Sequence, residues 1–260
     1  MEKESFISLE RMPLRLHLVN SNALAGNMSV NHEAAGSGEA GRNYREYLRM
    51  SGFEPKSTAL MNLPQPNGAS VIEVTKNMLV PDAEGRVLVK TDALVTKGEK
   101  KDGIALALLT GDCLPIVIAD TQSGVLALAH GSRKSIGAGI IPAVLQRMVD
   151  MGARPENMRV SVGPSIHKES YLFSPDKLDA LATEMQDRQW DDFLPEDDDG
   201  SVHVDVHGRV RKQLIDGSIP PGNIAMSPID TRVDEDYFSH ARASEMGEPE
   251  RRFVTAAMLV

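Results

Sequence analysis

Three continuous apolar runs follow one another in the middle of the chain and constrain its fold most strongly. They are residues 104–109, 114–119 and 125–129. Strands that are covered on both faces read as unbroken apolar runs, whereas half-exposed strands alternate apolar with polar residues. The runs therefore predict three buried strands with a further layer on each side.

Helix-type and strand-type patterns alternate along the rest of the chain. Apolar residues recur at helical spacing over 135–151, and Gly152 follows as a stop. Further patterns predict helices over 42–51, 175–186 and 205–216, and strands over 71–74, 87–89, 158–162, 224–227 and 254–260. Interleaved helices and strands favour an α+β or α/β fold over an all-α or all-β fold.

Two chemically able side chains lie at the ends of the predicted buried strands. Cys113, the single cysteine, precedes the second run, and His130 follows the third. If these strands are neighbours, the pair can bind a metal or act as nucleophile and base. A cysteine that packs as a small apolar side chain is the alternative. Asp112 either orients His130 or caps the strand end.

Composition excludes several classes of protein. A net charge of −9 argues against binding along a nucleic-acid backbone, which needs a basic face. One cysteine excludes an intrachain disulfide and CxxC-type zinc sites. No apolar stretch approaches the roughly 20 residues of a membrane span, and the acidic first residues do not resemble a signal peptide. We expect a cytoplasmic protein without nucleic-acid or membrane partners.

Four segments, in order, resemble the laccase-domain family. Its members carry the motifs T-A-D-C-x-P, A-H-A-G-W-R-G, G-P-x-I and F-S-x-R-R. The matching segments here are 110–115, 129–135, 163–166 and 238–242, and Tyr171 stands at a family tyrosine. The family was named for polyphenol oxidase and comprises zinc-dependent purine nucleoside phosphorylases with deaminase side activity.

The resemblance implies a fold, a reaction and a cofactor. It implies a single domain over residues 1–260, built as a layered α-β-β-α sandwich with mixed sheets, in the α+β class. It implies phosphorolysis of adenosine or inosine, with adenosine deamination as a second activity, in a monomer or homodimer. The partners would be a purine nucleoside and phosphate. Zinc would be held by Cys113, His130 and a third ligand.

Several residues depart from the family pattern, which makes this a diverged member. Asn67 stands where the family's Q-x-H-G segment has its histidine, and an amide is a poor zinc ligand. Lys134 replaces the motif arginine, and the preceding tryptophan position holds Arg133. His167 is a candidate for the lost ligand, with a surface histidine as the alternative. His203 and His207 are spaced for metal binding on a helix, but the alternating valines around them favour a strand.

The candidate site combines these residues. Asp112, Cys113 and His130 are the catalytic candidates, and Cys113, His130 and His167 are the metal candidates. Cationic side chains suit a phosphate. The candidates for substrate contact are Asn67, Arg133, Lys134, Ser239 and Arg242.

Two other function classes remain open. In a metal-free hydrolase or deamidase, Cys113 would be the nucleophile and His130 its base, which requires a lowered thiol pKa. A non-catalytic homologue would keep the fold and bind a ligand or partner. Multicopper oxidation needs more histidine and cysteine ligands than this chain offers.

Overall fold

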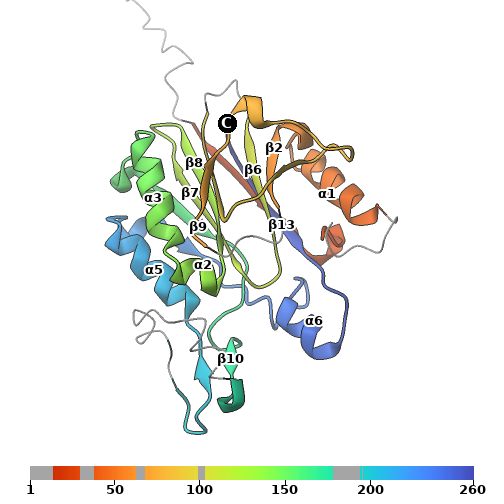
Figure 1. Ribbon diagram of the computed structural model, residues 1–260, viewed down its shortest axis with the longest axis vertical. Coiled ribbons are helices and arrows are strands. Elements are labelled where there is room, and N and C mark those ends of the chain that lie inside the picture. The colour runs from red at the N-terminus through yellow and green to blue at the C-terminus, as the bar shows by residue number, and fades with distance from the viewer. Residues whose placement is uncertain (1–13, 30–37, 63–67, 99–102, 178–193, 195) are drawn as a thin grey trace, which may run out of the picture.

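Two mixed β-sheets stack at the centre of the protein, and helices cover their outer faces (Figure 1). The computed structural model describes residues 14–29, 38–62, 68–98, 103–177, 194 and 196–260. In Figure 1, α1 (Glu39–Met50) lies on one side of the stacked sheets, and α3 (Ile140–Asp150) and α5 (Val206–Asp216) lie on the other. The predicted α-β-β-α sandwich is confirmed.

The first sheet has five strands and joins distant parts of the chain. Its order is β1 (Leu16–Asn20), β13 (Phe253–Leu259), β6 (Ala105–Thr110), β2 (Thr58–Met61) and β4 (Val87–Val89). β13 pairs antiparallel with both β1 and β6, whereas β2 runs parallel to β6 and β4. The sheet is therefore mixed.

The second sheet has six strands, and its middle strands carry the predicted site. Its order is β12 (Ile224–Met226), β9 (Arg159–Val162), β7 (Leu114–Asp120), β8 (Val125–Gly131), β5 (Ala93–Lys97) and β3 (Val71–Glu73). β7 and β8 are antiparallel, with Pro115 opposite His130. Their pairing brings the end of the third apolar run beside the start of the second.

Alternation along each strand explains why the central runs are apolar throughout. In β6, Leu106 and Leu108 face the space between the sheets, and Ala107 and Leu109 pack in the cluster under α1. β7 behaves in the same way, since Val117 faces the other sheet while its neighbours pack against the outer helices. Both faces of these strands are buried, as the sequence predicts.

The predicted helix over 135–151 is two helices. Residues 133–137 form α2 (Arg133–Gly137), and α3 starts after Gly139, whose φ is 86°. A left-handed residue interrupts the right-handed helix, and glycine adopts this conformation at little cost. The apolar periodicity continues across the break, so it cannot reveal the interruption.

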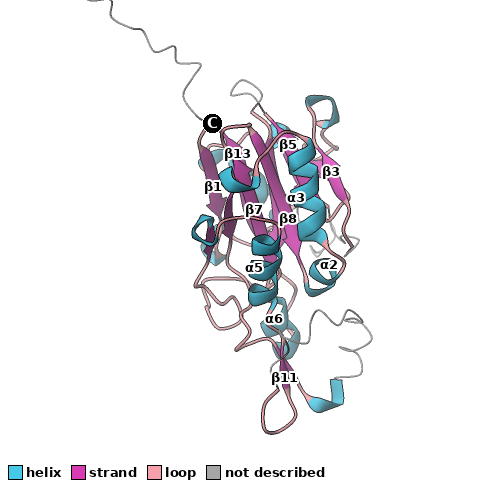
Figure 2. Ribbon diagram, turned by 90° about the vertical axis from the view of Figure 1, so that its left-hand side faces the viewer, coloured by secondary structure: helices cyan, strands magenta, loops and turns pink. Residues whose placement is uncertain are grey.

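A two-stranded arm projects beyond the sheets (Figures 1 and 2). It pairs β10 (Leu172–Phe173) with β11 (Val202–His203). The extended pattern predicted through residue 206 ends earlier, because Asp205 accepts a hydrogen bond from the Gly208 amide and starts α5 at Val206. The predicted helix over 175–186 begins as a 3-10 turn, Pro175–Lys177, and its remainder lies outside the described residues.

Candidate functional site

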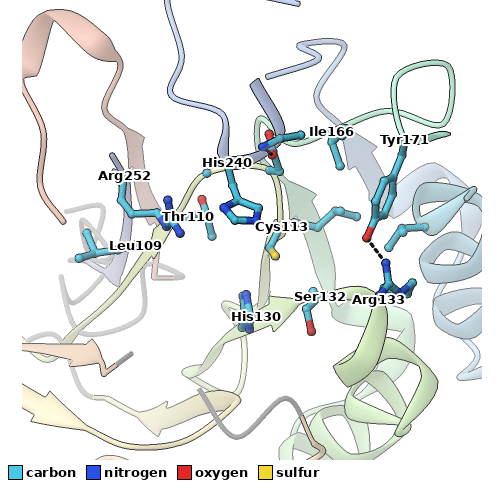
Figure 3. A pocket seen from close by; sticks show the side chains of 16 residues that line it. Leu109, Thr110, Cys113, His130, Ser132, Arg133, Ile166, Tyr171, His240 and Arg252 are labelled. Carbon is cyan, nitrogen blue, oxygen red and sulfur yellow. Dashed lines mark hydrogen bonds between the residues drawn. The ribbon is translucent and has the colours of Figure 1, made fainter. Parts of the chain in front are cut away.

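A cavity of about 500 Å³ opens at one edge of the sheets, where β6 and β8 end and β7 begins. Four residues named from the sequence line it, namely Asp112, Cys113, His130 and Arg133. Sequence reasoning gave no role to five other polar residues in its wall, which are Thr110, Ser132, Tyr171, His240 and Arg252. The cavity thus gathers side chains from across the chain (Figure 3).

Strand pairing brings Cys113 and His130 into the same wall. Cys113 directly precedes β7, and His130 lies on β8 opposite Pro115. In Figure 3 the Cys113 sulfur points toward the side of the cavity on which His130 lies. The hypothesis that neighbouring strands place the two together is consistent with this geometry.

Burial controls the protonation of both groups. Burial, together with the nearby Asp112 carboxylate, raises the pKa of Cys113 to about 11. It lowers the pKa of His130 to about 4. At neutral pH the wall therefore holds a thiol and a neutral imidazole. The Nδ1 atom of His130 is buried and has no hydrogen-bond partner, which leaves a donor atom available to a ligand.

Asp112 ties the turn before Cys113 to two distant segments. Its carboxylate accepts hydrogen bonds from Thr231 Oγ1 and from the Ala241 amide, both at 2.7 Å. Its carbonyl accepts a hydrogen bond from the Ile166 amide at 2.9 Å. The carboxylate oxygens thus bond to Thr231 and Ala241, and the structure gives no hydrogen bond from them to His130.

A second buried carboxylate lies behind His130. The carbonyl of Asp92 accepts a hydrogen bond from the His130 amide at 2.9 Å. Its carboxylate accepts from the Gly68 amide at 3.0 Å and from Ser70 Oγ at 2.8 Å. Asp92 therefore fixes the segment that begins at Gly68 against the strand that carries His130. The preceding residue, Asn67, lies outside the described residues.

Arg133 and Arg252 give the cavity its positive charge. Arg133 Nη1 donates a hydrogen bond to Tyr171 Oη at 2.6 Å, and its guanidinium lies 4.9 Å from the centre of the Phe173 ring. Arg252 forms an ion pair with Glu250, whose other oxygen lies 2.5 Å from His240 Nδ1. Arginines suit oxyanions because the guanidinium can donate two parallel hydrogen bonds.

Three of the predicted substrate contacts lie outside this cavity. Arg242 donates to the carbonyls of Thr231, Arg232, Asp234 and Tyr237, so it fastens the loop before α6 (His240–Met246). Ser239 caps that helix by accepting from the Arg242 amide at 3.1 Å. Lys134 lies on α2 and does not line the cavity.

His167 lines a second cavity of about 270 Å³. Its ring centre lies 4.5 Å from that of His207, which shares this cavity. His203 instead lies on the arm, where it contacts the Lys168 carbonyl and the Asp197 carboxylate. The three histidines therefore do not join Cys113 and His130.

Among the described residues, no group of three or more histidine, cysteine, aspartate or glutamate side chains could hold a metal ion. Cys113 and His130 thus form a pair of donors without a third in that part of the chain. In the same part of the chain, no helix has the length and apolar character needed to cross a membrane.

Comparison with known proteins gives a consistent result. A family model described as multi-copper polyphenol oxidoreductase laccase matches residues 25–258. A purine nucleoside phosphorylase of Streptomyces coelicolor is 32% identical over 196 residues, covering 75% of this chain and 74% of the relative. A purine nucleoside phosphorylase of Streptomyces griseus is 31% identical over 207 residues, covering 80% of this chain and 78% of the relative. An adenosine deaminase from an unknown prokaryote is 28% identical over 173 residues, covering 66% and 64%.

Solved structures share the fold. The hypothetical protein YfiH of Bacillus licheniformis superposes with a TM-score of 0.75 at 20% identity, covering 90% of this chain and 85% of that one. YlmD of Geobacillus stearothermophilus gives a TM-score of 0.74 at 23% identity, covering 89% and 84%.

Proposed function

The chain belongs to the family described as multi-copper polyphenol oxidoreductase laccase, and we propose that it is a diverged, zinc-dependent purine nucleoside phosphorylase. Its substrates would be adenosine or inosine together with phosphate, and adenosine deamination would be a second activity. One observation carries the proposal: the Cys113 and His130 donors share a cavity of about 500 Å³ with Arg133 and Arg252. The names of the relatives support the same reaction class.

Cys113 and His130 fit zinc by their chemistry. Thiolate sulfur and neutral imidazole nitrogen are its preferred protein ligands, and His130 is neutral above about pH 4. The unpartnered Nδ1 of His130 is also the kind of buried donor that a ligand satisfies. When bound, zinc would supply Lewis-acid chemistry and would favour the thiolate form of Cys113, whose proton would pass to solvent.

The protein's own side chains suit the two reactants. Arg133 and Arg252 would bind phosphate oxygens through charge-assisted hydrogen bonds. Apolar residues of the wall, among them Leu109, Leu114 and Ile166, would contact the flat purine. Asp112 would hold the turn that presents Cys113, since its carboxylate is bonded to Thr231 and Ala241.

The raised thiol pKa argues against the metal-free alternative. A Cys/His nucleophile needs a thiolate near neutral pH, which requires a lowered pKa. Burial instead raises the pKa of Cys113 to about 11. The structure gives no hydrogen bond between Cys113 and His130 that would offset this effect.

The test combines metal content with product analysis. Untagged protein is measured by elemental mass spectrometry beside Cys113→Ser and His130→Asn variants, with His203→Asn as a histidine control outside both cavities. We expect near-stoichiometric zinc in wild type and control, and its loss in the two site variants.

Chromatography then follows base release from adenosine and inosine, with and without phosphate. Phosphorolysis predicts free base and ribose 1-phosphate only when phosphate is present. Base release without phosphate would contradict it in favour of a hydrolase. Nucleoside binding without turnover by the zinc-loaded protein would favour the non-catalytic alternative.

A further inference from the structure

Thr110 carries a buried hydroxyl that makes no hydrogen bond to any residue in the described part of the chain. It is the last residue of β6, it lines the cavity of about 500 Å³, and only 2% of it is exposed. Its Oγ1 atom is buried and has no partner among the described residues. A buried hydroxyl normally has a partner, because one without a partner costs its desolvation. This atom therefore points to a ligand that supplies the missing hydrogen bond.

His240 presents a second polar atom to the same cavity. It is the first residue of α6, and 55% of its side chain is exposed. Its Nδ1 atom lies 2.5 Å from a carboxylate oxygen of Glu250. Burial raises the pKa of Glu250, but Arg252 and His240 outweigh that effect and hold the pKa below its ordinary value, so this partner is a carboxylate. In the neutral imidazole, Nδ1 therefore carries the proton, and Nε2 is a hydrogen-bond acceptor.

Two connections bring Thr110 and His240 to the same part of the cavity wall. The Asp112 carboxylate, two residues after Thr110, accepts a hydrogen bond at 2.7 Å from the Ala241 amide, which follows His240. β13 begins opposite Thr110, and Glu250, the partner of His240, lies three residues before that strand. In Figure 3 the side chains of Thr110 and His240 lie on the same side of the cavity. One ligand can therefore meet both.

The two side chains suit neighbouring hydroxyls better than a phosphate. A phosphate presents acceptor oxygens and needs donors, whereas the Nε2 lone pair of a neutral imidazole can only accept. A hydroxyl of a ligand can donate to Nε2, and a second hydroxyl can donate to Thr110 Oγ1 or accept from it. Neither group brings a charge that would require a counter-ion. A ribose offers this pair of hydroxyls on adjacent carbons.

We propose that Thr110 and His240 bind the 2′- and 3′-hydroxyls of the substrate's ribose, one hydroxyl each, and so select ribonucleosides over deoxyribonucleosides. This inference rests on the proposed function and specifies its substrate class. A site built to hydrogen-bond a hydroxyl rejects a ligand that lacks it, because its own polar group is then left without a partner. Glu250 supports the selection by fixing the orientation of the His240 ring.

Calorimetric titration of the intact protein tests this selection without requiring turnover. The ligands are adenosine, 2′-deoxyadenosine and 3′-deoxyadenosine, at pH 8, where histidine side chains are ordinarily neutral. We expect wild type to bind adenosine about tenfold more tightly than either deoxynucleoside. Equal affinity for the three ligands would overturn the inference. Failure of adenosine to bind at all would overturn both the inference and the proposed function.

Variants at Thr110 assign one of the two hydroxyls. Thr110→Val keeps the shape of the side chain and removes its hydroxyl. It should weaken adenosine about tenfold, to the affinity of one deoxynucleoside, and keep the preference over the other. Thr110→Ser keeps the hydroxyl and should retain part of the lost preference. Thr75→Val is the control, because Thr75 is exposed and its side chain forms no cap hydrogen bond.

Variants at His240 assign the other hydroxyl. Asparagine places its amide at the position of Nδ1 and has no atom at that of Nε2, whereas glutamine places its amide at that of Nε2. We therefore expect His240→Asn to lose the preference that Thr110→Val keeps, and His240→Gln to retain part of it. If Thr110→Val and His240→Asn each weaken all three ligands equally, neither residue reads a hydroxyl, and the proposal fails.

The stability of ligand-free Thr110→Val separates a binding role from a structural one. Because the hydroxyl has no partner among the described residues, its removal should leave the melting temperature unchanged or raise it. A structural hydroxyl would instead lose a hydrogen bond inside the protein. A lower melting temperature for Thr110→Val than for wild type would therefore overturn the assignment of this hydroxyl to the ligand.

Turnover assays separate this inference from the proposed function. Phosphorolysis of adenosine and both deoxyadenosines with equal kcat/KM would remove the inference alone. A preference for binding adenosine in a zinc-loaded protein that cleaves none of the three would remove the phosphorylase activity and leave the ribose contacts supported.

Discussion

Residue 112 has a φ of 99°, a backbone conformation that residues other than glycine rarely adopt. Such strain persists only where surrounding contacts fix it, and it concentrates at functional sites. Here the carboxylate bonds to Thr231 and Ala241 supply those contacts. They hold the turn in the shape that presents Cys113 to the cavity.

Removing the Asp112 side chain should therefore destabilise the protein strongly. Asp112→Ala leaves one buried donor, Thr231 Oγ1, and one part-buried donor, the Ala241 amide, without an acceptor, and we expect the free energy of unfolding to fall by about 2–4 kcal/mol. Urea denaturation measures it. Asp216→Ala removes an exposed carboxylate paired with Lys212 and should cost at most about 0.5 kcal/mol. Equal effects of the two variants would contradict the bracing role of Asp112.

Cys113 should react slowly with alkylating reagents in metal-free protein. Only the thiolate reacts, and a pKa of about 11 leaves roughly one part in a thousand ionised at pH 8. The rate with iodoacetamide, followed by mass spectrometry, should rise about tenfold per pH unit between pH 7 and 10. A rate that is already constant below pH 8 would show a stabilised thiolate and would restore the nucleophile hypothesis.

Among the elements, the loop before α6 depends on a single arginine. The guanidinium of Arg242 donates to carbonyls of Thr231, Arg232, Asp234 and Tyr237. Lysine has a single ammonium group and cannot reproduce the planar set of donors that a guanidinium provides. We expect Arg242→Lys to lower the free energy of unfolding by about 1–3 kcal/mol, with phosphate affinity unchanged in titrations. Weaker phosphate binding at unchanged stability would instead return Arg242 to the substrate contacts predicted from the sequence.

Elements with strong local patterns could be predicted from the sequence, and the others could not. The runs over 104–109, 114–119 and 125–129 correspond to β6, β7 and β8, because burial on both faces makes them apolar throughout. Local sequence patterns did not predict β1, β2 or β5. β2 has four residues and β1 is half-buried along its length, so neither offers a long apolar run.

Some residues of the candidate site could be predicted from local sequence patterns, and others could not. Cys113 and His130 belong to the first group, because they lie at the ends of two strands that are close in the sequence and pair with each other. His240 and Arg252 come from a distant part of the chain, and only the tertiary fold brings them to the cavity. Asn67 stays a prediction, because it lies outside the described residues.

For the whole molecule, two buried histidines predict a loss of stability in acid. His130 and His207 have pKa values of about 4 in the folded protein, against 6.5 for an ordinary histidine. Between these values the unfolded chain binds more protons, so stability is full above pH 6.5 and falls toward pH 4. Their combined effect is on the order of 2–5 kcal/mol.

Urea denaturation between pH 7 and 4.5 measures this loss. His207→Asn should flatten the decline, and His203→Asn should not, because the folded pKa of His203 is raised and its contribution has the opposite sign. A decline of the same steepness in both variants would contradict the assignment to His207.

The stacked sheets also predict a single unfolding transition. The cluster between them draws residues from both, including Leu106 of β6 and Leu126 of β8, so neither sheet has a complete core alone. We expect the calorimetric and van't Hoff enthalpies to agree in differential scanning calorimetry. Two resolved transitions would contradict the single domain proposed for residues 1–260.

The position of β13 has a consequence for biosynthesis. This strand, the last in chain order, lies inside the five-stranded sheet between β1 and β6. A ribosome therefore makes both neighbours long before the strand that joins them, and β6 keeps an open backbone edge while the rest of the chain is translated. Such edges invite pairing with other chains. The sheet can close only after residues 253–259 have left the exit tunnel, so its assembly is a late step that coincides with the completion of the cavity by Arg252.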